Sequence, residues 1–286
     1  MIKLIECPRD AMQGLKEFIS TETKIKYINQ LLKVGFDTID FGSFVSPKAI
    51  PQMRDTSEVV QRLDLSETNT ELLCIVANRR GANDAVKFNN ITYLGYPFSI
   101  SETFQMRNTN ATIEESLERV AQIQELCLAN NKKMLVYISM GFGNPYGDPW
   151  NVEIVQKWVD RLVDLDINYF QLSDTIGVSN PDSIAYLFSN LISKYKPKGI
   201  EIGAHLHTTP TTWKEKIKSA YESGCTRFDG AIKGFGGCPM AKDDLTGNMP
   251  TERMVNYFDS LDLDTGVDLE LFNECVKSAT QVFPIH

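Results

Sequence analysis

The sequence alternates from end to end between short apolar runs and segments with helical character. The eight runs, rich in Ile, Val, Leu, Phe and Tyr, lie at residues 2–7, 38–41, 72–77, 91–94, 134–139, 169–172, 200–205 and 227–232. Continuous apolar runs of this length are typical of strands buried on both faces of a parallel sheet. Eight strand–helix units within about 260 residues match the size of a (β/α)₈ barrel, also called a TIM barrel. We therefore predict an α/β chain with this architecture.

Several segments between the runs carry signals for helix starts. Residues 112–115 and 55–58 both read as capping boxes, in which a polar side chain at the first position is followed by Glu three residues later. The pairs Asp148-Pro149 and Asn180-Pro181 each place a cap residue before a proline at the first helical position. Residues 267–282 read as an extra C-terminal helix that follows the eighth unit.

The alternative α/β architecture is a doubly wound sheet. Such a sheet usually has fewer strands, and no Gly-x-Gly-x-x-Gly follows the first apolar run here. The sequence also has no low-complexity segment and no charge block. We therefore expect residues 1–286 to form a single catalytic (β/α)₈ barrel domain.

The overall charge excludes some functional classes. The 286 residues carry 29 Lys and Arg against 37 Asp and Glu, a formal net charge of -8, which argues against a nucleic-acid partner because such proteins carry basic stripes. No apolar run approaches the roughly 18 residues that a membrane span needs. The first six residues begin directly in strand-like sequence, so we expect no signal or transit peptide.

The cysteines favour a reducing compartment. Six are scattered along the chain without a Cys-x-x-Cys pair: Cys7, Cys74, Cys127, Cys225, Cys238 and Cys275. This pattern is typical of reduced thiols rather than of a secreted disulfide scaffold. We expect a cytoplasmic protein.

Two histidines form the sharpest local signal. His205 and His207 lie at the end of the seventh apolar run, and residues i and i+2 of a strand point to the same face. In a barrel the active site lies at the carboxyl ends of the strands, and Asp10 follows the first run at that end. Nitrogen and oxygen ligands fit Mg²⁺, Mn²⁺, Co²⁺ or Zn²⁺. The alternative is a histidine pair that only bonds to neighbouring polar groups.

Two loops at the same end carry further candidates. Arg9 precedes Asp10, and its guanidinium can hold a developing oxyanion, although an Arg-Asp pair is most often a solvated surface pair. Residues 234–239 form a glycine-rich loop that contains Cys238. This loop could be a mobile lid that brings a proton-transfer thiol to the site, or a tight turn with an incidental cysteine.

In these residues and in the motifs around them, the chain resembles the 3-hydroxy-3-methylglutaryl-CoA lyase family of metal-dependent TIM-barrel lyases. The Ser-Phe-Val-Ser-Pro-Lys and Gly-Gly-Cys-Pro motifs are specific signals, whereas a His-x-His motif alone is not. Related Claisen synthases share the barrel and His-x-His but usually lack the Gly-Gly-Cys-Pro loop. The matching stretches occur in family order at residues 8–10, 43–48, 51–53, 112–116, 173–178, 205–207, 236–239 and 247–248.

The resemblance implies an Mg²⁺- or Mn²⁺-dependent enzyme that cleaves an acyl-CoA, 3-hydroxy-3-methylglutaryl-CoA, to acetoacetate and acetyl-CoA by retro-Claisen chemistry. It implies that Arg9 stabilises the enolate oxygen, that Cys238 transfers protons, and that the chain forms a homodimer. The general base is left open between Asp10 and the histidine pair. The implied metal ligands are Asp10, His205, His207 and Asn248, and the implied substrate- or CoA-binding residues are Gln13, Lys16, Asn108 and Asp174.

The sequence departs from the family pattern at three places, and these bear on which acyl group the enzyme accepts. Asp40 stands where the family usually has a catalytic-site Glu, so a carboxylate remains but is one methylene shorter. Thr208 stands where an Asp usually follows the second histidine. The stretch between Cys238 and Asn248 is one residue longer than usual. None of the three removes an implied metal ligand.

Two other hypotheses remain open at this stage. One is a related barrel enzyme, either a lyase acting on a different 3-hydroxyacyl-CoA or a Claisen-type synthase that joins an acyl-CoA to a 2-oxo acid. The other is a non-catalytic barrel that binds an acyl-CoA or a partner. Retention of Arg9, Asp10, His205, His207, Cys238 and Asn248 speaks against the second.

The sequence predicts that Cys238→Ser keeps the fold, the metal and substrate binding but loses most turnover. A thiol exchanges protons near neutral pH, whereas a serine hydroxyl does not. We further expect Cys238 to be the cysteine alkylated fastest in the free enzyme, and bound substrate to slow that alkylation. Steady-state kcat and mass spectrometry of alkylated peptides measure both effects. A near-normal kcat, or faster labelling of Cys74 or Cys127, would contradict the prediction.

Overall fold

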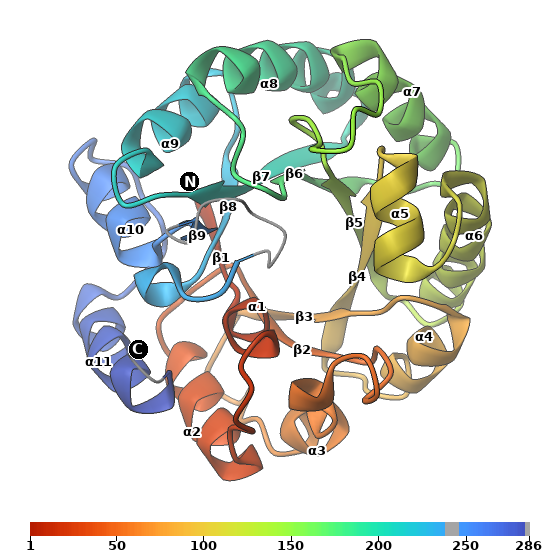
Figure 1. The fold of residues 1–286 in the computed structure, drawn as a ribbon. Coiled ribbons are helices and arrows are strands. Elements are labelled where there is room, and N and C mark those ends of the chain that lie inside the picture. The colour runs from red at the N-terminus through yellow and green to blue at the C-terminus, as the bar shows by residue number, and fades with distance from the viewer. Residues whose placement is uncertain (238–245, 284–286) are drawn as a thin grey trace.

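Eight parallel strands close into a ring that the helices surround (Figure 1). The computed structural model describes residues 1–237 and 246–283. The hydrogen-bonded strand order is β6-β5-β4-β3-β2-β1-β8-β7, and a further β6–β7 pairing closes the barrel. This confirms the predicted (β/α)₈ barrel. The strands are β1 (Lys3–Glu6), β2 (Thr38–Ser43), β3 (Glu71–Ile75), β4 (Ile91–Ser99), β5 (Lys133–Ser139), β6 (Tyr169–Asp174), β7 (Glu201–Thr208) and β8 (Arg227–Gly230).

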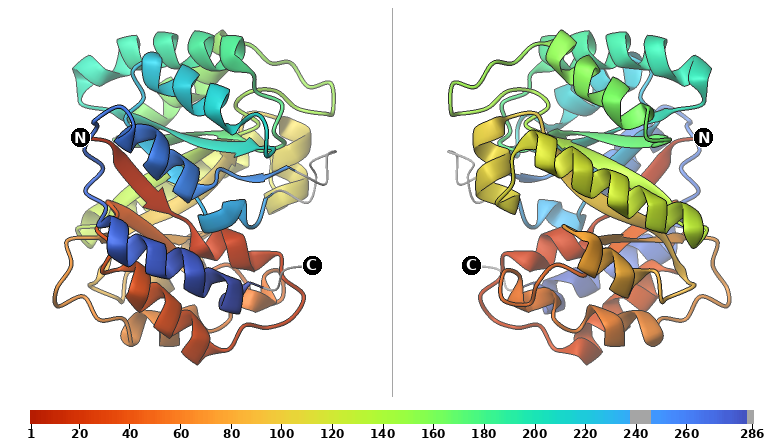
Figure 2. Two further views of the ribbon diagram at one scale, coloured as in Figure 1. Left: turned by 90° about the vertical axis from the view of Figure 1, so that its left-hand side faces the viewer. Right: turned by 90° about the vertical axis from the view of Figure 1, so that its right-hand side faces the viewer.

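The helices form a layer around the outside of the ring, except for α1, which lies inside this layer near the strand ends (Figure 1). None in the described part of the chain is long and apolar enough to cross a membrane. They are α1 (Pro8–Gln13), α2 (Thr21–Leu31), α3 (Thr56–Gln61), α4 (Arg79–Ala85), α5 (Glu102–Thr109), α6 (Ile113–Ala129), α7 (Val152–Val163), α8 (Pro181–Tyr195), α9 (Trp213–Glu222), α10 (Thr251–Asp259) and α11 (Leu269–Val282). The predicted C-terminal helix is confirmed as α11, which lies beside α2 (Figure 2).

All eight apolar runs form strands, and β4 and β7 extend furthest beyond the predicted ends. β4 continues to Ser99 through Gly95 and Pro97, residues that weaken a strand pattern. Pro97 is tolerated because β3 pairs with β4 only up to Gly95, and beyond it the described register pairs β4 with β5 alone. β7 continues to Thr208, so both histidines of the His-x-His motif belong to the strand.

Three of the four predicted helix starts are confirmed, because α3, α6 and α8 begin directly after Asp55, Thr112 and Asn180, and two of them also have the predicted capping bond. At α6 the Thr112 side chain accepts from the backbone N–H of Glu115, and the Glu115 carboxylate accepts from the backbone N–H of Thr112, which completes a capping box. At α8 the Asn180 side chain accepts from the backbone N–H of Ser183, with Pro181 at the first helical position. These caps depend on neighbouring residues alone, which makes them readable from sequence.

The other two predicted caps are wrong, because tertiary contacts take the side chains. Asp55 makes no capping bond to α3; it accepts instead from Lys24 at 2.7 Å and from Thr21 at 2.9 Å. Asp148 lies ahead of α7, which starts at Val152 after an Asn151 cap. The Asp148 carboxylate accepts from residues at the start of α5 instead.

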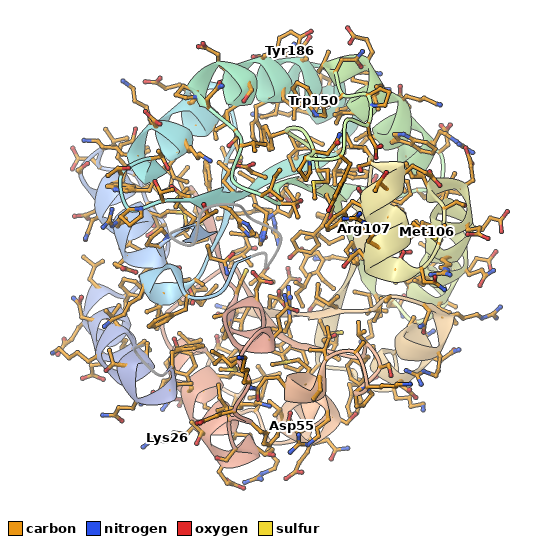
Figure 3. All side chains as sticks on the ribbon, viewed as in Figure 1. Lys26, Asp55, Met106, Arg107, Trp150 and Tyr186 are labelled. Carbon is orange, nitrogen blue, oxygen red and sulfur yellow. The ribbon has the colours of Figure 1, made fainter. Side chains whose placement is uncertain are left out.

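Side chains fill both the barrel interior and the layer between barrel and helices (Figure 3). The large apolar cluster joins the outer faces of the strands to the inner faces of the helices. A smaller cluster on the inner face of β3, β4 and β5 contains Leu73, Tyr93, Leu135 and Tyr137. Because both strand faces are buried, polar groups at the strand ends are the ones left to face a site.

A buried glutamate ties β1 to the segment that follows β8. Glu6, 1% exposed, accepts from the backbone N–H of Ile232 at 2.9 Å and from the Thr251 hydroxyl at 2.6 Å. A short antiparallel strand, β9 (Gly247–Asn248), then pairs with the end of β7. Glu6 therefore fixes both ends of the segment that carries the predicted glycine-rich loop and Asn248.

We predict that Glu6→Gln changes the pH dependence of stability. Burial raises the pKa of Glu6 from 4.5 to about 8. A raised pKa means that the neutral carboxyl stabilises the fold fully below pH 4.5, and that this stabilisation is lost as the pH rises through about 8. The melting temperature of Glu6→Gln should therefore rise relative to wild type across this pH window. Glu58→Gln, at an exposed position, serves as the control; a pH-independent difference for Glu6→Gln would refute the prediction.

Candidate active site and metal centre

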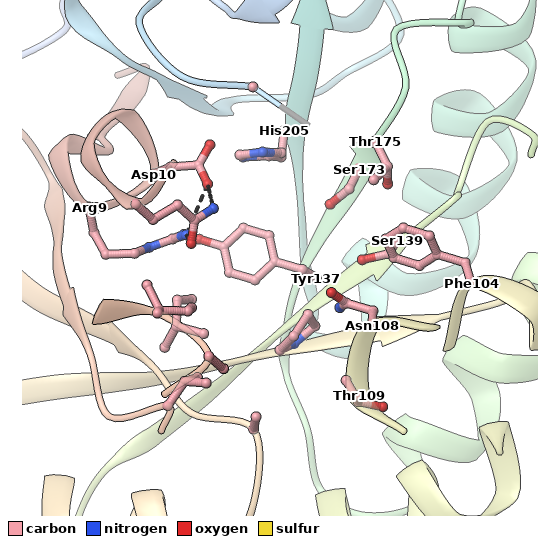
Figure 4. A pocket seen from close by; sticks show the side chains of 18 of the residues that line it. Arg9, Asp10, Phe104, Asn108, Thr109, Tyr137, Ser139, Ser173, Thr175 and His205 are labelled. Atoms are coloured by element: carbon pink, nitrogen blue, oxygen red, sulfur yellow. Dashed lines mark hydrogen bonds and ion pairs between the residues drawn. The ribbon is translucent and has the colours of Figure 1, made fainter. Parts of the chain in front are cut away.

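A pocket of about 370 Å³ opens at the carboxyl ends of the barrel strands (Figure 4). Its polar side includes Arg9, Asp10, Gln13, Tyr137, His205 and His207. Its apolar side includes Val45, Ile50, Ile75, Pro97 and Phe104. This is the end of the barrel at which the sequence placed the candidate site.

Asp10, His205 and His207 come together as a triad. One carboxylate oxygen and one nitrogen from each ring all lie within 4.8 Å of one another. Asp10 lies in α1, directly after β1, and the two histidines lie on one face of β7 with ring centroids 5.3 Å apart. The geometry can hold a divalent cation.

Asn248, the fourth implied ligand, adjoins this triad. It pairs with His207 across the β9–β7 ladder and is 3% exposed. Its amide nitrogen donates to Asp10 Oδ2 and to the carbonyl of Phe235, both at 2.8 Å. Since both amide hydrogens are used, the amide oxygen is the atom available to a cation.

His207 carries the observation that favours a metal most directly. Its ring is buried, and neither ring nitrogen has a well-aligned hydrogen-bond partner in the described chain, although the ring has an electrostatic contact with the Thr175 backbone. Burial, followed by the neighbouring His205, lowers the pKa of His207 to about 4. A buried polar group without a partner costs free energy, and a neutral imidazole is the form that binds metals. The donor set therefore fits a cation.

His205 is oriented by a residue that the sequence reading missed. Its Nδ1 lies 3.0 Å from Asp229 Oδ2 on β8, and Gln171 donates to the other oxygen of Asp229. This contact leaves Nε2 for a ligand, as second-shell carboxylates commonly do for metal-binding histidines. Burial alone lowers the pKa of His205, but the hydrogen bond and charge of Asp229 outweigh it and raise the pKa.

Arg9 is held rigidly on the other side of Asp10. Its Nη1 donates to Asp10 Oδ1 at 2.9 Å and to Gln13 Oε1 at 2.8 Å. Its Nε and Nη2 donate to Asp40 Oδ2 at 3.0 and 2.5 Å. Burial alone lowers the pKa of Arg9, but Asp40 and Asp10 outweigh it, so the guanidinium stays charged.

The remaining predicted site residues differ in whether they line the pocket, lie buried beside it or lie outside it. Gln13 and Asn108 line the pocket, whereas Lys16 is exposed beyond α1 and is not among the lining residues. Asp40 is fully buried beneath Arg9, so its carboxylate positions the guanidinium rather than facing the pocket. Asp174 is buried at the end of β6 and accepts from Ser179 and Lys216. Cys238 lies outside the described residues.

Three residues of the site escaped the sequence reading. Asp229 carried a usable signal, because a carboxylate inside a buried strand requires a partner. Tyr137 stacks its ring edge-on against His205, with centroids 5.5 Å apart, but read as an ordinary strand aromatic. Lys216 lies in α9, where a lysine is normally a solvated surface residue.

Comparison with known proteins identifies the family of this chain. Residues 2–277 match the sequence profile of the HMGL-like family. The chain belongs to the HMGL-like family. The chain is thus an HMG-CoA lyase-like enzyme by family, which confirms the resemblance read from the motifs. It is 34% identical over 270 residues to the hydroxymethylglutaryl-CoA lyase of Bacillus subtilis, covering 94% of this chain and 89% of that protein. It is 32% identical over 269 residues to the cytoplasmic 3-hydroxy-3-methylglutaryl-CoA lyase of Rattus norvegicus, covering 94% and 77%.

Solved structures of HMGL-like proteins agree in fold. The Bacillus subtilis HMG-CoA lyase superposes with a TM-score of 0.91 at 32% identity, covering 98% of this chain and 93% of that chain. An Acinetobacter baumannii HMG-CoA lyase, described in complex with coenzyme A and 3-methylmalate, gives 0.90 at 30% identity, covering 99% and 91%. The carboxyl transferase domain of Rhizobium etli pyruvate carboxylase, at 15% identity and a TM-score of 0.71, shares the fold alone.

We predict that Asp229→Asn shifts the pH dependence of Mn²⁺ binding to lower pH. Protons compete with the ion for His205, and Asp229 raises the pKa of that histidine. Asn keeps an acceptor for the Nδ1–H but removes the charge, so the proton should leave at lower pH. Titration of Mn²⁺ binding against pH measures the midpoint. Asp84→Asn, at a half-exposed position of α4 away from the site, is the matched control. A midpoint that stays in place or moves upward would show that Asp229 does not tune the site.

Proposed function

We propose that this protein cleaves 3-hydroxy-3-methylglutaryl-CoA to acetoacetate and acetyl-CoA as a divalent-metal-dependent carbon–carbon lyase. The observation that carries the proposal is the direct bond between Arg9 Nη1 and Asp10, a member of the triad with His205 and His207. This bond sets a cation site and a permanent positive charge side by side in one pocket. A retro-Claisen cleavage needs both, because charge moves from a hydroxyl oxygen to an enolate oxygen.

The proposed ion is Mg²⁺ or Mn²⁺, held by Asp10, His205, His207 and Asn248. Carboxylate, imidazole and amide ligands suit these ions. The Cys7 sulfur lies within 4.8 Å of ligand atoms of His205 and Asp229, but burial raises the pKa of this thiol, so it offers no thiolate that would favour zinc. When bound, such an ion polarises the oxygens of the substrate and fixes it by chelation.

Arg9 would stabilise the enolate as the carbon–carbon bond breaks. Four of its five N–H groups are held by Asp40, Asp10 and Gln13, so the guanidinium needs no reorganisation during the reaction. Preorganised charge of this kind is usually the largest single contribution to catalysis. Asp40 would act through Arg9, as a positioning residue.

Two proton transfers complete the proposed reaction. The substrate hydroxyl proton has Asp10 and His205 as its candidate acceptors. Burial alone raises the pKa of Asp10, but Arg9 and the two histidines lower it to about 2; a carboxylate that binds the ion through one lone pair still keeps others for a proton. His205, with Nδ1 on Asp229 and Nε2 on the ion, would keep none. Cys238 would return a proton to the enolate carbon, and the neighbouring Gly237 lines the pocket.

The proposed substrate class is a CoA thioester. The Acinetobacter baumannii relative at 30% identity is described in complex with coenzyme A, which supports the same ligand here. Gln13 and Asn108 offer polar contacts within the pocket, and Asp174 would support it from the end of β6. Lys16, exposed near the start of the chain, would reach CoA only from the rim.

A lyase on a different 3-hydroxyacyl-CoA is the second candidate, and one observation favours it. Asp40 is fully buried and holds Arg9 at 2.5 Å, in place of the longer Glu that the family usually has. A carboxylate one methylene shorter would draw the guanidinium toward β2 and so alter the space left for the acyl group. A homodimer and a cytoplasmic location stay predictions, since relatives are named both cytoplasmic and mitochondrial.

The proposal predicts release of acetoacetate from 3-hydroxy-3-methylglutaryl-CoA in the presence of Mg²⁺ or Mn²⁺. Arg9→Lys should lower kcat by at least about 10²-fold, because lysine keeps the charge but loses the planar set of donors. Mn²⁺ binding should persist in this variant, because Arg9 is not a ligand. A coupled assay for acetoacetate measures the loss of kcat, and titration with Mn²⁺ measures the retained metal binding.

The exposed Arg62→Lys is the matched control and should keep wild-type kcat. An Arg9→Lys variant with near-normal kcat would assign Arg9 a structural role only. No acetoacetate from this thioester, with cleavage of another 3-hydroxyacyl-CoA, would favour the second candidate function.

A further inference from the structure

A buried lysine lies directly behind the proposed metal centre. Lys216 projects from α9, is 2% exposed, and pairs with Asp174, whose side chain is fully buried. Its ammonium donates to Asp174 Oδ2 at 2.7 Å, to the carbonyl of His207 at 2.8 Å and to the carbonyl of Gly177 at 3.2 Å. The three donor positions of a lysine are therefore all used.

These three acceptors belong to different parts of the site. The carbonyl of His207 is the backbone of a proposed metal ligand. Asp174 ends β6, and Gly177 lies in the turn that follows, between the pocket-lining Thr175 and the start of α8. Lys216 thus joins the end of β7 to the β6 loop from outside the barrel.

We propose that Lys216 is a positioning residue for the metal ligand His207, an inference that rests on the proposed metal centre. The His207 ring makes no well-aligned hydrogen bond within the described chain, so its position depends on its backbone. Two contacts fix that backbone: the antiparallel pairing of His207 with Asn248, and the bond from Lys216 to the His207 carbonyl. Residues that orient metal ligands typically contribute 10- to 100-fold to metal affinity.

The competing explanation is that Lys216 only neutralises Asp174. A buried carboxylate without a cation is strongly destabilising, so loss of the lysine would weaken the fold by itself. The two explanations differ once Asp174 is also made neutral. The double variant Lys216→Met/Asp174→Asn removes the unpaired charge but still leaves the His207 carbonyl without its donor.

Thr208, the departure from the family pattern next to His207, does not take over this task. Its hydroxyl donates to the carbonyl of Thr209 at 3.0 Å and lies 2.9 Å from the Thr212 hydroxyl. These contacts hold the start of α9 and not the His207 backbone. Lys216 is therefore the side chain that connects α9 to the ligand itself.

The experiment measures Mn²⁺ affinity of the metal-free protein by the electron paramagnetic resonance signal of unbound Mn²⁺, alongside the melting temperature. We expect Lys216→Met to raise the dissociation constant at least about 10-fold. We expect the double variant to recover melting temperature but to keep the weakened affinity. Lys218→Met, the same substitution at an exposed position of α9, is the matched control and should change neither value.

Two results would overturn the inference while the metal centre stands: wild-type affinity in Lys216→Met, or restored affinity in the double variant. The second would mean that Lys216 acts only as the counter-charge of Asp174. A wild-type protein that binds no Mn²⁺ would overturn the proposed metal centre and this inference together. Because the readout uses no substrate, a wrong acyl group in the proposed function would leave the result unaffected.

Discussion

The rest of the site depends on the hydrogen bonds that the Asp10 carboxylate accepts. Its Oδ1 accepts from Arg9 and Gln13, and its Oδ2 accepts from Asn248. Through these bonds one partly buried anion connects α1 to β2, by way of Arg9 and Asp40, and to β9 beside β7. Loss of its charge would leave several buried donors unpaired at once, and such losses are among the costliest in a folded protein.

Charge balance at the strand ends explains why Asp10 can face a cation. Three other carboxylates surround the site, and each has a cationic or potentially cationic partner: Asp40 with Arg9, Asp174 with Lys216 and Asp229 with His205. Because these charges are paired in the low dielectric of the protein, they add little net potential to the pocket. The metal-binding groups left facing the pocket are Asp10 and the histidine rings, which together with Asn248 make up the ligand set of the proposed metal centre.

Local sequence signals predicted the parts of the fold that depend on near neighbours. The eight strands and the caps at Thr112 and Asn180 were all readable, since apolar runs and capping bonds involve residues a few positions apart. The caps assigned to Asp55 and Asp148 failed because distant partners, 31 and 47 residues away, bind those side chains instead. A short polar motif does not reveal such competition.

The sequence by itself determined the barrel, the family and the cluster of Asp10, His205 and His207, because strand periodicity and the rule that barrel sites lie at strand ends suffice to bring those residues together. Only the tertiary structure decided how the cluster is supported. Asp229 reaches His205 across 24 residues of sequence and Lys216 reaches Asp174 across 42. Such pairings depend on which elements become neighbours when the sheet closes, and on the free-energy cost of leaving any buried charge without a partner.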